Sequence, residues 1–140
     1  MNSNNQISTN RCVILLDENL PFGRAANATA VIALTIGQRH PYLVGDPLID
    51  ASGVNHPGLI PIGITVLSAS YEDLNKVRED GINAGCDVID FPLEGQLTKD
   101  YQAFMDAVAV IETSKLVYVG VALVGEKKSI RKITGHLKLM

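Results

Sequence analysis

Two acidic residues that could do chemistry stand where predicted strands end. Asp17 closes the apolar run 11–17, and Asp90 lies near the end of the run 86–91. In open α/β sheets, ligands collect at the carboxyl ends of strands, so these acids could share one crevice and act as an acid–base pair. The alternative is that both acids only terminate strands or cap the next helix. Asp90 and Asp17 are the candidate catalytic residues.

A second group of candidates lies at the start of a predicted helix, 24–36. Asn27 is an amide in the first turn of this otherwise apolar helix, and Arg24 lies three residues earlier on the same face. Together they could present donors to an anion or a carbonyl, and Gly23 would let a ligand approach closely. The alternative is that Asn27 ties the preceding loop to the helix. The candidate ligand-binding residues here are Gly23, Arg24 and Asn27.

Strands that alternate with helices must position these residues. Continuous apolar runs predict strands at 11–17, 62–67, 86–91 and 116–124, the last of them central. Helices are predicted at 24–36, ending at Gly37 and largely buried, at 127–133, and after the capping residues Ser70 and Thr98. This alternation implies a three-layer α/β/α fold with a mixed sheet of about four to five strands.

The segment between the first helix and the second strand, residues 40–61, is rich in proline and glycine. It predicts a long excursion with one short hairpin. His40, Asp46, Asp50 and His56 lie in this segment and have ligand-type chemistry, but their spacing matches no metal signature. We therefore expect turn residues here and no metal site.

Composition places the chain among ordinary globular proteins. It has 140 residues, of which 46% are hydrophobic and 19% charged, and no apolar run approaches the roughly 18 residues of a membrane span. The polar first ten residues predict a flexible N-terminal tail at 1–10, followed by a single α/β domain at 11–140. Cys12 and Cys86 are far apart in sequence and lie in predicted strands. They suggest buried, reduced thiols and a cytoplasmic location.

The end of the chain is basic although the net charge is −3. Lys127, Lys128, Arg131 and Lys132 fall on one side of the last predicted helix. These cations could contact RNA phosphates; the alternative is a solvated face, since only 5% of the residues are aromatic and little is available for base stacking. Apolar segments at 42–44 and 59–60 favour a homodimer.

Several signatures are absent from the sequence. It contains no Gly-x-Gly-x-x-Gly, no phosphate-binding loop ending in Gly-Lys-Ser/Thr and no serine nucleophile elbow. We therefore expect no cofactor.

Two segments resemble the type II peptidyl-tRNA hydrolase family. Strand 11–17, the turn Asn19-Leu20 and the helix start Gly23-Arg24-Ala25-Ala26-Asn27 are similar to that family's strand, Asp-Leu turn and Gly-Lys-rich, Ala-Ala-Gln helix start. The closing Ile133-Thr134-Gly135-His136-Leu137-Lys138-Leu139 is similar to its Val-Thr-Gly-His-Leu-Lys-Leu. The string Leu20-Pro21-Phe22-Gly23-Arg24-Ala25-Ala26-Asn27-Ala28 resembles more closely the domain-of-unknown-function-2000 family, which has no assigned reaction.

The resemblance implies a peptidyl-tRNA hydrolase II-like fold, with departures at the site. Arg24 stands where the hydrolases carry a catalytic lysine, and an arginine does not lose its proton near neutral pH. In the hydrolases' Asp-Ala-Gly-Arg/Lys-Thr segment, only Asp90 and loosely Thr98 correspond, which adds Thr98 to the candidate ligand-binding residues. His136 in the closing motif is expected to hold the fold together. The sequence leaves two functions open: a hydrolase with an altered active site and substrate, or a non-catalytic small-molecule or RNA binding module.

Overall fold

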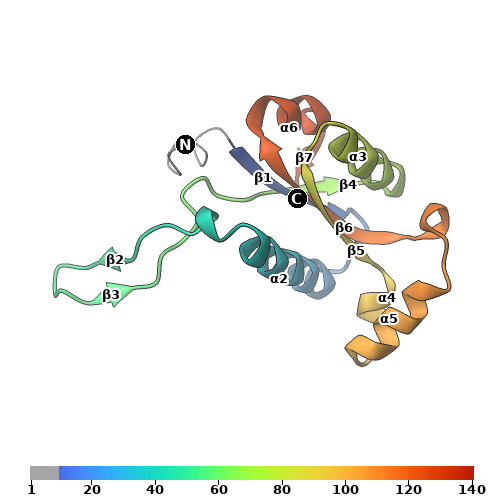
Figure 1. Cartoon of the computed structure of the whole chain (residues 1–140), viewed down its shortest axis with the longest axis horizontal. Helices are drawn as coiled ribbons and strands as arrows, with labels where there is room; N and C mark the ends of the chain where they lie inside the picture. The colour runs from blue at the N-terminus through green and yellow to red at the C-terminus, as the bar shows by residue number, and fades with distance from the viewer. Residues whose placement is uncertain (1–9) are drawn as a thin grey trace.

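A computed structural model describes residues 10–140, and its centre is a mixed five-stranded sheet (Figure 1). The strands are β1 (Asn10–Asp17), β4 (Thr65–Ala69), β5 (Asp87–Pro92), β6 (Tyr118–Glu126) and β7 (Lys138–Leu139). Their order is β5-β6-β1-β4-β7. β1 pairs in parallel with β4, whereas β6 is antiparallel to both β1 and β5, and β7 is antiparallel to β4. The predicted mixed sheet is confirmed; the predicted tail lies outside the described residues except for Asn10, which begins β1.

Helices cover both faces of this sheet, as the alternating pattern predicts. α2 (Phe22–Arg39) packs on one face, and α3 (Tyr71–Asn83) with α6 (Lys127–Thr134) packs on the other (Figure 1). Two further helices, α4 (Glu94–Leu97) and α5 (Tyr101–Ala109), follow the end of β5. Short 3-10 turns lie at η1 (Pro41–Leu43) and η2 (Thr113–Lys115). Among residues 10–140, no helix combines the length and the hydrophobicity of a membrane span.

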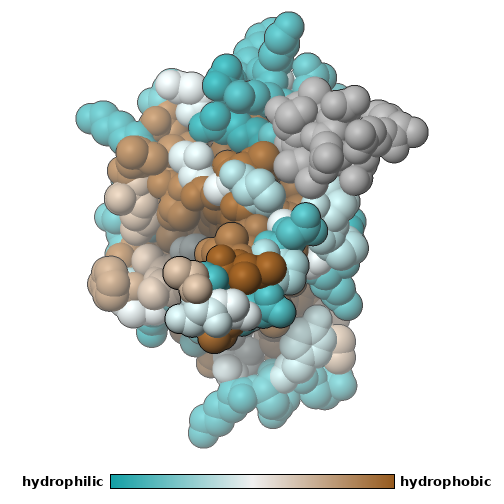
Figure 2. All heavy atoms as spheres, turned by 90° about the vertical axis from the view of Figure 1, so that its left-hand side faces the viewer, coloured by the Kyte–Doolittle hydropathy of each residue, from teal (hydrophilic) through white to brown (hydrophobic). Residues whose placement is uncertain are grey.

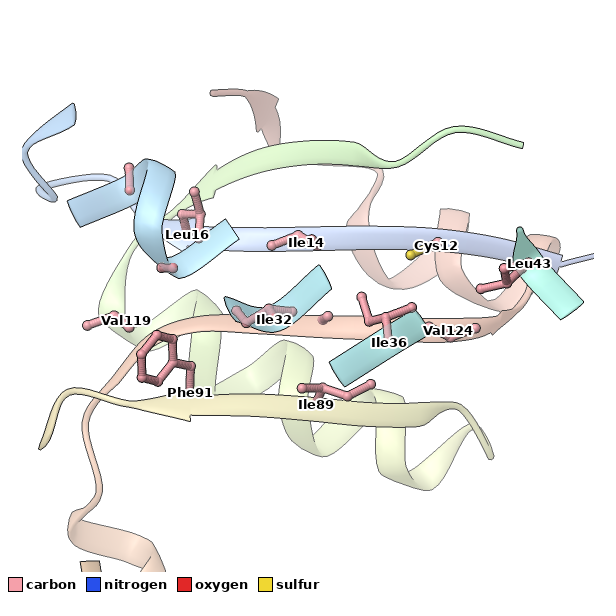
Figure 3. Packing of buried hydrophobic residues seen from close by; sticks show 13 residues of the cluster. Cys12, Ile14, Leu16, Ile32, Ile36, Leu43, Ile89, Phe91, Val119 and Val124 are labelled. Atoms are coloured by element: carbon pink, nitrogen blue, oxygen red, sulfur yellow. The ribbon is translucent and has the colours of Figure 1, made fainter. Parts of the chain in front are cut away.

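The middle strand β1 supplies the core of both layers. Val13 to Leu16 are at most 1% exposed, and their side chains alternate between the two faces. Ile14 and Leu16 join the cluster under α2, which also contains Ile32 of that helix and Phe91 of β5 (Figure 3). Val13 and Leu15 join the cluster under α3 and α6. The continuous apolar run thus reflects a strand that is covered on both sides.

Several predicted boundaries are wrong. α2 continues through Gly37 to Arg39, and its outer face is exposed, with Leu34 80% accessible, so the helix is not largely buried. The second predicted strand begins three residues late, at Thr65. The 116–124 run gives an interior strand, β6, but β1 is the middle one. α4 and β7 were not predicted, because each is too short to show a periodic pattern.

Capping residues explain where the other helices begin and end. Ser70 Oγ accepts a hydrogen bond from the backbone N–H of Asp73 at 3.1 Å, which confirms the predicted start of α3. Gly85, at φ +81°, ends the same helix in a conformation that favours glycine. Thr98 does not cap α5. That helix is capped by Asp100, whose Oδ1 accepts from the N–H of Ala103 at 2.8 Å.

The excursion 40–61 is confirmed as a hairpin, and it projects away from the sheet (Figure 1). Its strands are β2 (Leu48–Ile49) and β3 (Asn55–His56), which pair in antiparallel fashion. We call residues 45–60 the arm. At its tip, Asp50 Oδ1 accepts from the N–H groups of Ser52 and Val54. His56 lies against the same carboxylate, 2.9 Å from Oδ2, so Asp50 and His56 are turn residues, as predicted.

Asp87, at the start of β5, ties the root of the arm to the sheet. Its carboxylate accepts hydrogen bonds from Arg39 Nε at 2.7 Å and Arg39 Nη2 at 2.8 Å, and His40 Nε2 lies 2.6 Å from Oδ2. The hydrogen bonds from Arg39, supported by His40, lower the pKa of Asp87 below its ordinary value of 3.8. Leu43, in η1, is buried in the core beneath α2. The root of the arm is therefore held by both charge and burial.

Replacing Asp87 by Asn should lower the free energy of unfolding by about 1–2 kcal/mol near neutral pH, because the charge-assisted bonds are lost at a partly exposed site. A lowered folded-state pKa means that the carboxylate stabilises the fold above about pH 4 and loses this effect as the pH falls through the folded pKa. Urea unfolding at several pH values would measure both quantities. Asp46→Asn, an exposed carboxylate of the arm, is the control; equal losses in both variants would contradict the anchoring role.

Candidate functional site

The carboxyl ends of three strands lie along one edge of the sheet. β1 and β4 are parallel, and β5 runs in the same direction because both β1 and β5 are antiparallel to β6. Asp17 and Asp90 therefore stand near the same edge. Neighbouring residues of a strand point to opposite faces, however, and this alternation decides which side chains can meet.

A hollow on the α2 face gathers two of the predicted residues. It has a volume of about 270 Å³ and lies between α2, the end of β5 and the α4–α5 segment. We call it the α2–α5 hollow; it is lined by Asn27, Val31, Phe91, Gly95, Thr98, Lys99, Asp100, Tyr101 and Phe104. Asn27 and Thr98, which are 71 positions apart in the chain, thus line one cavity. An apolar hollow of about 280 Å³ adjoins it and shares Tyr101 and Phe104.

Gln96 of α4 joins the wall of this hollow to the start of α2. Its Nε2 donates to the backbone oxygen of Arg24 at 2.9 Å and to Oδ1 of Asn27 at 3.2 Å. This leaves the donor end of the Asn27 amide without a hydrogen-bond acceptor among residues 10–140. Sequence reasoning missed Gln96, although it lies within the departing segment between Asp90 and Thr98. Its signal is an amide in a short polar stretch just after a buried strand.

Two oxygens beside the hollow are buried without a hydrogen-bond partner among the described residues. They are Gln96 Oε1 and Glu94 Oε2, both in α4. Buried acceptors are normally paired, so these two oxygens leave unused acceptor capacity in the α4 turn. Gly95 lies between them, and a Cβ there would collide with Phe91 and Phe104. Glycine at this position lets the aromatic rings close the base of the hollow.

The outer wall of the hollow is α5, which is only lightly attached to the body. No residue of α5 is buried. Its contact with the sheet passes through Phe104, whose ring centroid lies 6.2 Å from that of Phe91 and 6.0 Å from that of Tyr101. Few buried apolar contacts mean that this helix can move at low free-energy cost. A ligand could therefore reach the aromatic rings by displacing α5.

Gly23 and Arg24 precede Asn27 by about one helical turn and are not among the residues that line the hollow. A Cβ at Gly23 would have no atom within 4 Å, so the space in front of it is open. Arg24 is exposed, and its guanidinium forms no ion pair within residues 10–140. Phe22, just before them, is 89% exposed. The predicted helix start is therefore accessible, and Gln96 bonds the backbone oxygen of Arg24 together with the side chain of Asn27.

Asp90 lies on the opposite face of the sheet. Its Oδ2 accepts a hydrogen bond from Arg78 Nε of α3 at 2.7 Å, and the Arg78 guanidinium lies 5.3 Å from the ring centroid of Tyr118. The bond to Asp90 raises the pKa of Arg78. A second hollow of about 390 Å³ lies beside this pair, lined by Asn75, Arg78, Glu79, Thr113, Ser114 and Tyr118. Sequence analysis missed Arg78, because its only signal in the sequence is a cation directly after Val77, which is buried.

Asp17 has a local role that supports the simpler of its two interpretations. Its Oδ1 accepts from the backbone N–H of Asn19 at 2.9 Å and so shapes the turn after β1. By strand alternation it shares the α3 face with Val13 and Leu15, away from Asn27. The four residues that the sequence proposed as one site, Asp17, Arg24, Asn27 and Asp90, do not share a cleft. The sheet separates the two acids from the amide.

The remaining candidates are placed as follows. His136 is exposed, and its Nε2 lies 3.8 Å from Asp73 Oδ1, which is too far for a hydrogen bond that would hold the fold together.

Burial raises the pKa of the Cys12 thiol to about 11, so this thiol is protonated and unreactive near neutral pH. No cluster of three or more His, Cys, Asp or Glu side chains in the described range is arranged to hold a metal ion.

The fold and the hollow define the class of this protein. It is an α/β protein with a mixed sheet, helices on both faces of the sheet and a small hollow beside α2. Residues 10–140 match the family described as "Protein of unknown function (DUF2000)", and the chain belongs to this family, which confirms that part of the sequence prediction. A solved structure of a protein of unknown function, Atu0240 from Agrobacterium tumefaciens strain C58, has a similar fold. Its TM-score is 0.85 at 22% identity, over 94% of this chain and 98% of that one. No curated protein matches the chain.

The hydroxyl of Tyr118 gives a prediction for the second hollow. This oxygen is buried and has no hydrogen-bond partner among the described residues, and burial raises the pKa of the phenol. Removing an unpaired buried polar group costs little, so Tyr118→Phe should keep the free energy of unfolding within about 0.5 kcal/mol of wild type or raise it. Arg78→Ala should lower it, because Asp90 loses its partner. Chemical denaturation would compare the two. A loss above about 1 kcal/mol in Tyr118→Phe would reveal a partner for this hydroxyl.

Proposed function

We propose that this chain is a non-catalytic binding module for a small molecule, with its site in the α2–α5 hollow. The observation that carries the proposal is that Asn27, Thr98 and Lys99 meet the rings of Phe91, Tyr101 and Phe104 in one hollow. Sites for small ligands combine apolar walls with a few convergent polar groups, which this hollow provides. The proposal is the second of the two functions that the sequence leaves open.

The polar groups favour one kind of ligand. The amide nitrogen of Asn27 and the ammonium of Lys99 are donors, and the carboxylate of Asp100 is already occupied by the cap of α5. A carboxylate or carboxamide oxygen on the ligand would satisfy these donors. The rings and Val31, together with the adjoining apolar hollow, would take an aryl or acyl chain. The preferred ligand is therefore a small aryl or acyl compound with a carbonyl-containing head group.

Hydrolysis is the weaker alternative because of where the acids lie. A hydrolase built on Asp90 with Arg24 and Asn27 needs all three groups within hydrogen-bond reach of one substrate. Asp90 instead pairs with Arg78 across the sheet from Asn27. The relation to the peptidyl-tRNA hydrolase II fold likewise stays a proposal, supported by the closing segment, in which β7 follows α6 and pairs with β4. A cytoplasmic location also stays a proposal, and it is supported by the two free cysteines, Cys12 and Cys86.

Binding can be tested with three matched probes: phenylpropanoate, phenylpropanamide and phenylpropanol. Titration followed by NMR should show the acid and the amide binding more tightly than the alcohol, with shifts at residues of the α2–α5 hollow. Asn27→Ala should weaken the acid and the amide about three- to tenfold, the value of one hydrogen bond, because the free donor is lost. Asn83→Ala, an exposed amide at the end of α3, is the control and should bind as wild type does.

Three outcomes would contradict this proposal. The first is the absence of binding by all three probes at millimolar concentration. The second is equal weakening by Asn27→Ala and Asn83→Ala. The third is release of ammonium from phenylpropanamide by the protein, which would show that the bound compound is turned over. In that case the hydrolase alternative returns, with catalytic groups other than Asp90.

RNA contact through α6 is a second candidate function, favoured by one observation. Lys127, Lys128, Arg131 and Lys132 are all exposed, and none forms an ion pair with an acid of residues 10–140. Ile130 and Thr134, on the other side of the helix, are buried. The cations therefore form a free basic face that could neutralise phosphates.

We expect Lys128→Glu combined with Arg131→Glu to weaken binding to single-stranded oligouridylate at least about tenfold, because two phosphate contacts become repulsive. Lys115→Glu, an exposed cation outside α6, is the control. Filter binding at a series of salt concentrations is the measurement. Affinity that does not fall with salt, or that survives the double substitution, would exclude this face as an RNA contact.

A further inference from the structure

The arm carries more apolar surface than its own chain can bury. Apart from Gly58 and Ile60, every residue from 46 to 60 is exposed, and Ile49 is 71% accessible. The large aliphatic residues exposed along the arm and at its root are Val44, Leu48, Ile49, Val54 and Leu59. Figure 2, which faces the projecting side, shows hydrophobic side chains at the near end of the molecule and a hydrophobic, hollowed region behind them.

The arm is nevertheless built to hold one shape. Gly45 N–H donates to the carbonyl of Leu59 at 2.8 Å, and a Cβ on Gly58 would collide with the carbonyl of Gly45, so the two limbs cross closely only because both residues are glycines. Asp50 closes the tip with the bonds described above. An isolated two-stranded hairpin is marginally stable in water. A shaped arm with exposed aliphatic residues therefore needs a surface to pack on.

The same chain offers such a surface beside the root of the arm. A groove of about 590 Å³ runs between the outer face of α2 and Val44, lined by Ala33, Leu34, Thr35, Gly37, Gln38 and Val44. No charged side chain lies in it. Leu34, which lines it, is 80% exposed, although it belongs to a helix whose other face is in the core. The apolar outer face of α2, which its own sheet does not need, is thus unpartnered within residues 10–140.

We propose that two copies of this chain exchange arms about a twofold axis, so that the tip of each arm lies in the α2 groove of the other. The groove lies at the root of the arm. If the arms of two copies lie side by side in antiparallel fashion, a twofold axis through their middle brings the tip of each arm to the root of the other. One symmetric contact then covers both apolar surfaces of both copies. Apolar residues on both sides of the arm, Ile49 on one and Leu48 with Val54 on the other, fit an arm that is clasped between two bodies.

The available area matches what a stable dimer needs. A fully exposed aliphatic side chain of this size presents roughly 100 Å². Six of them, each between about half and four-fifths exposed, give on the order of 400 Å² of apolar surface per chain: Leu34, Val44, Leu48, Ile49, Val54 and Leu59. A standard interface buries about 800 Å² per partner, of which somewhat more than half is apolar, or about 450 Å². The exchange of arms therefore suffices for a stable pair.

The first test is the mass of the full chain in solution. Light scattering after gel filtration should give twice the 15.0 kDa of one chain. Ile49→Asp and Leu34→Asp should each raise the dimer dissociation constant about a hundredfold or more, since a charge would be buried at the contact. Both residues are exposed in one chain, so the fold should survive, as circular dichroism would verify. Val110→Asp, 85% exposed on the α5 side, is the matched control and should stay dimeric.

A second test checks that the arm meets the groove of the other copy. Ile49→Lys and Leu34→Asp should each give monomers alone, and a mixture of the two variants should give heterodimers. In such a pair, the ammonium introduced on the arm of one copy faces the carboxylate introduced in the groove of the other, while the second contact keeps its native residues.

Three results would overturn the proposal. The first is a wild-type mass of one chain at about 0.1 mM, a concentration far above the Kd of most interfaces of standard size. The second is a dimer that survives both aspartate substitutions. The third is a mixture of the Ile49→Lys and Leu34→Asp variants that stays monomeric.

Discussion

The antiparallel ladder between β1 and β6 is the contact on which the rest of the structure depends. It pairs Asn10 with Glu126 and Leu16 with Gly120, and so joins two segments that are more than 100 residues apart in the chain. Closing such a long loop is costly in entropy and is repaid only when the apolar residues of both strands are covered. Gly120 allows α2 to pack closely on this ladder, because a Cβ at that position would lie 2.8 Å from Ile32 of α2. The helix that carries Asn27 is therefore held close to the sheet by the ladder.

The same sheet divides the chemistry of the molecule between two faces. Phe91 and Asp90 are neighbours in β5, yet Phe91 lines the hollow under α5 whereas Asp90 pairs with Arg78 of α3. The α2 face holds hydrogen-bond donors beside aromatic rings, which suits recognition of a carbonyl compound. The α3 face holds a charge pair that stacks on Tyr118 and is largely satisfied internally. This division favours binding over acid–base chemistry.

Helix α2 serves both regions that we consider functional. Its first turns present Asn27 to the α2–α5 hollow, its inner face supplies Ile32 and Ile36 to the core, and its outer face lines the groove at the root of the arm. A helix that is apolar almost all round is usually enclosed by its own fold. Here one side is enclosed by the sheet and the other is open, which is the pattern expected if a second copy completes its burial. The charged anchor at Asp87 fixes the arm relative to this helix.

The sequence by itself determined the local structure and the family. Apolar runs located β1, β5 and β6, Ser70 marked the start of α3, and proline and glycine predicted the hairpin, because these signals depend on residues close together in the chain. Only the tertiary structure decided the site. Which face Asp90 takes depends on the register of β5 against β6, where a shift of one residue would turn it to the other side. The meeting of Asn27 with Thr98 and the bridge from Gln96 likewise depend on packing between distant segments, which no local pattern encodes.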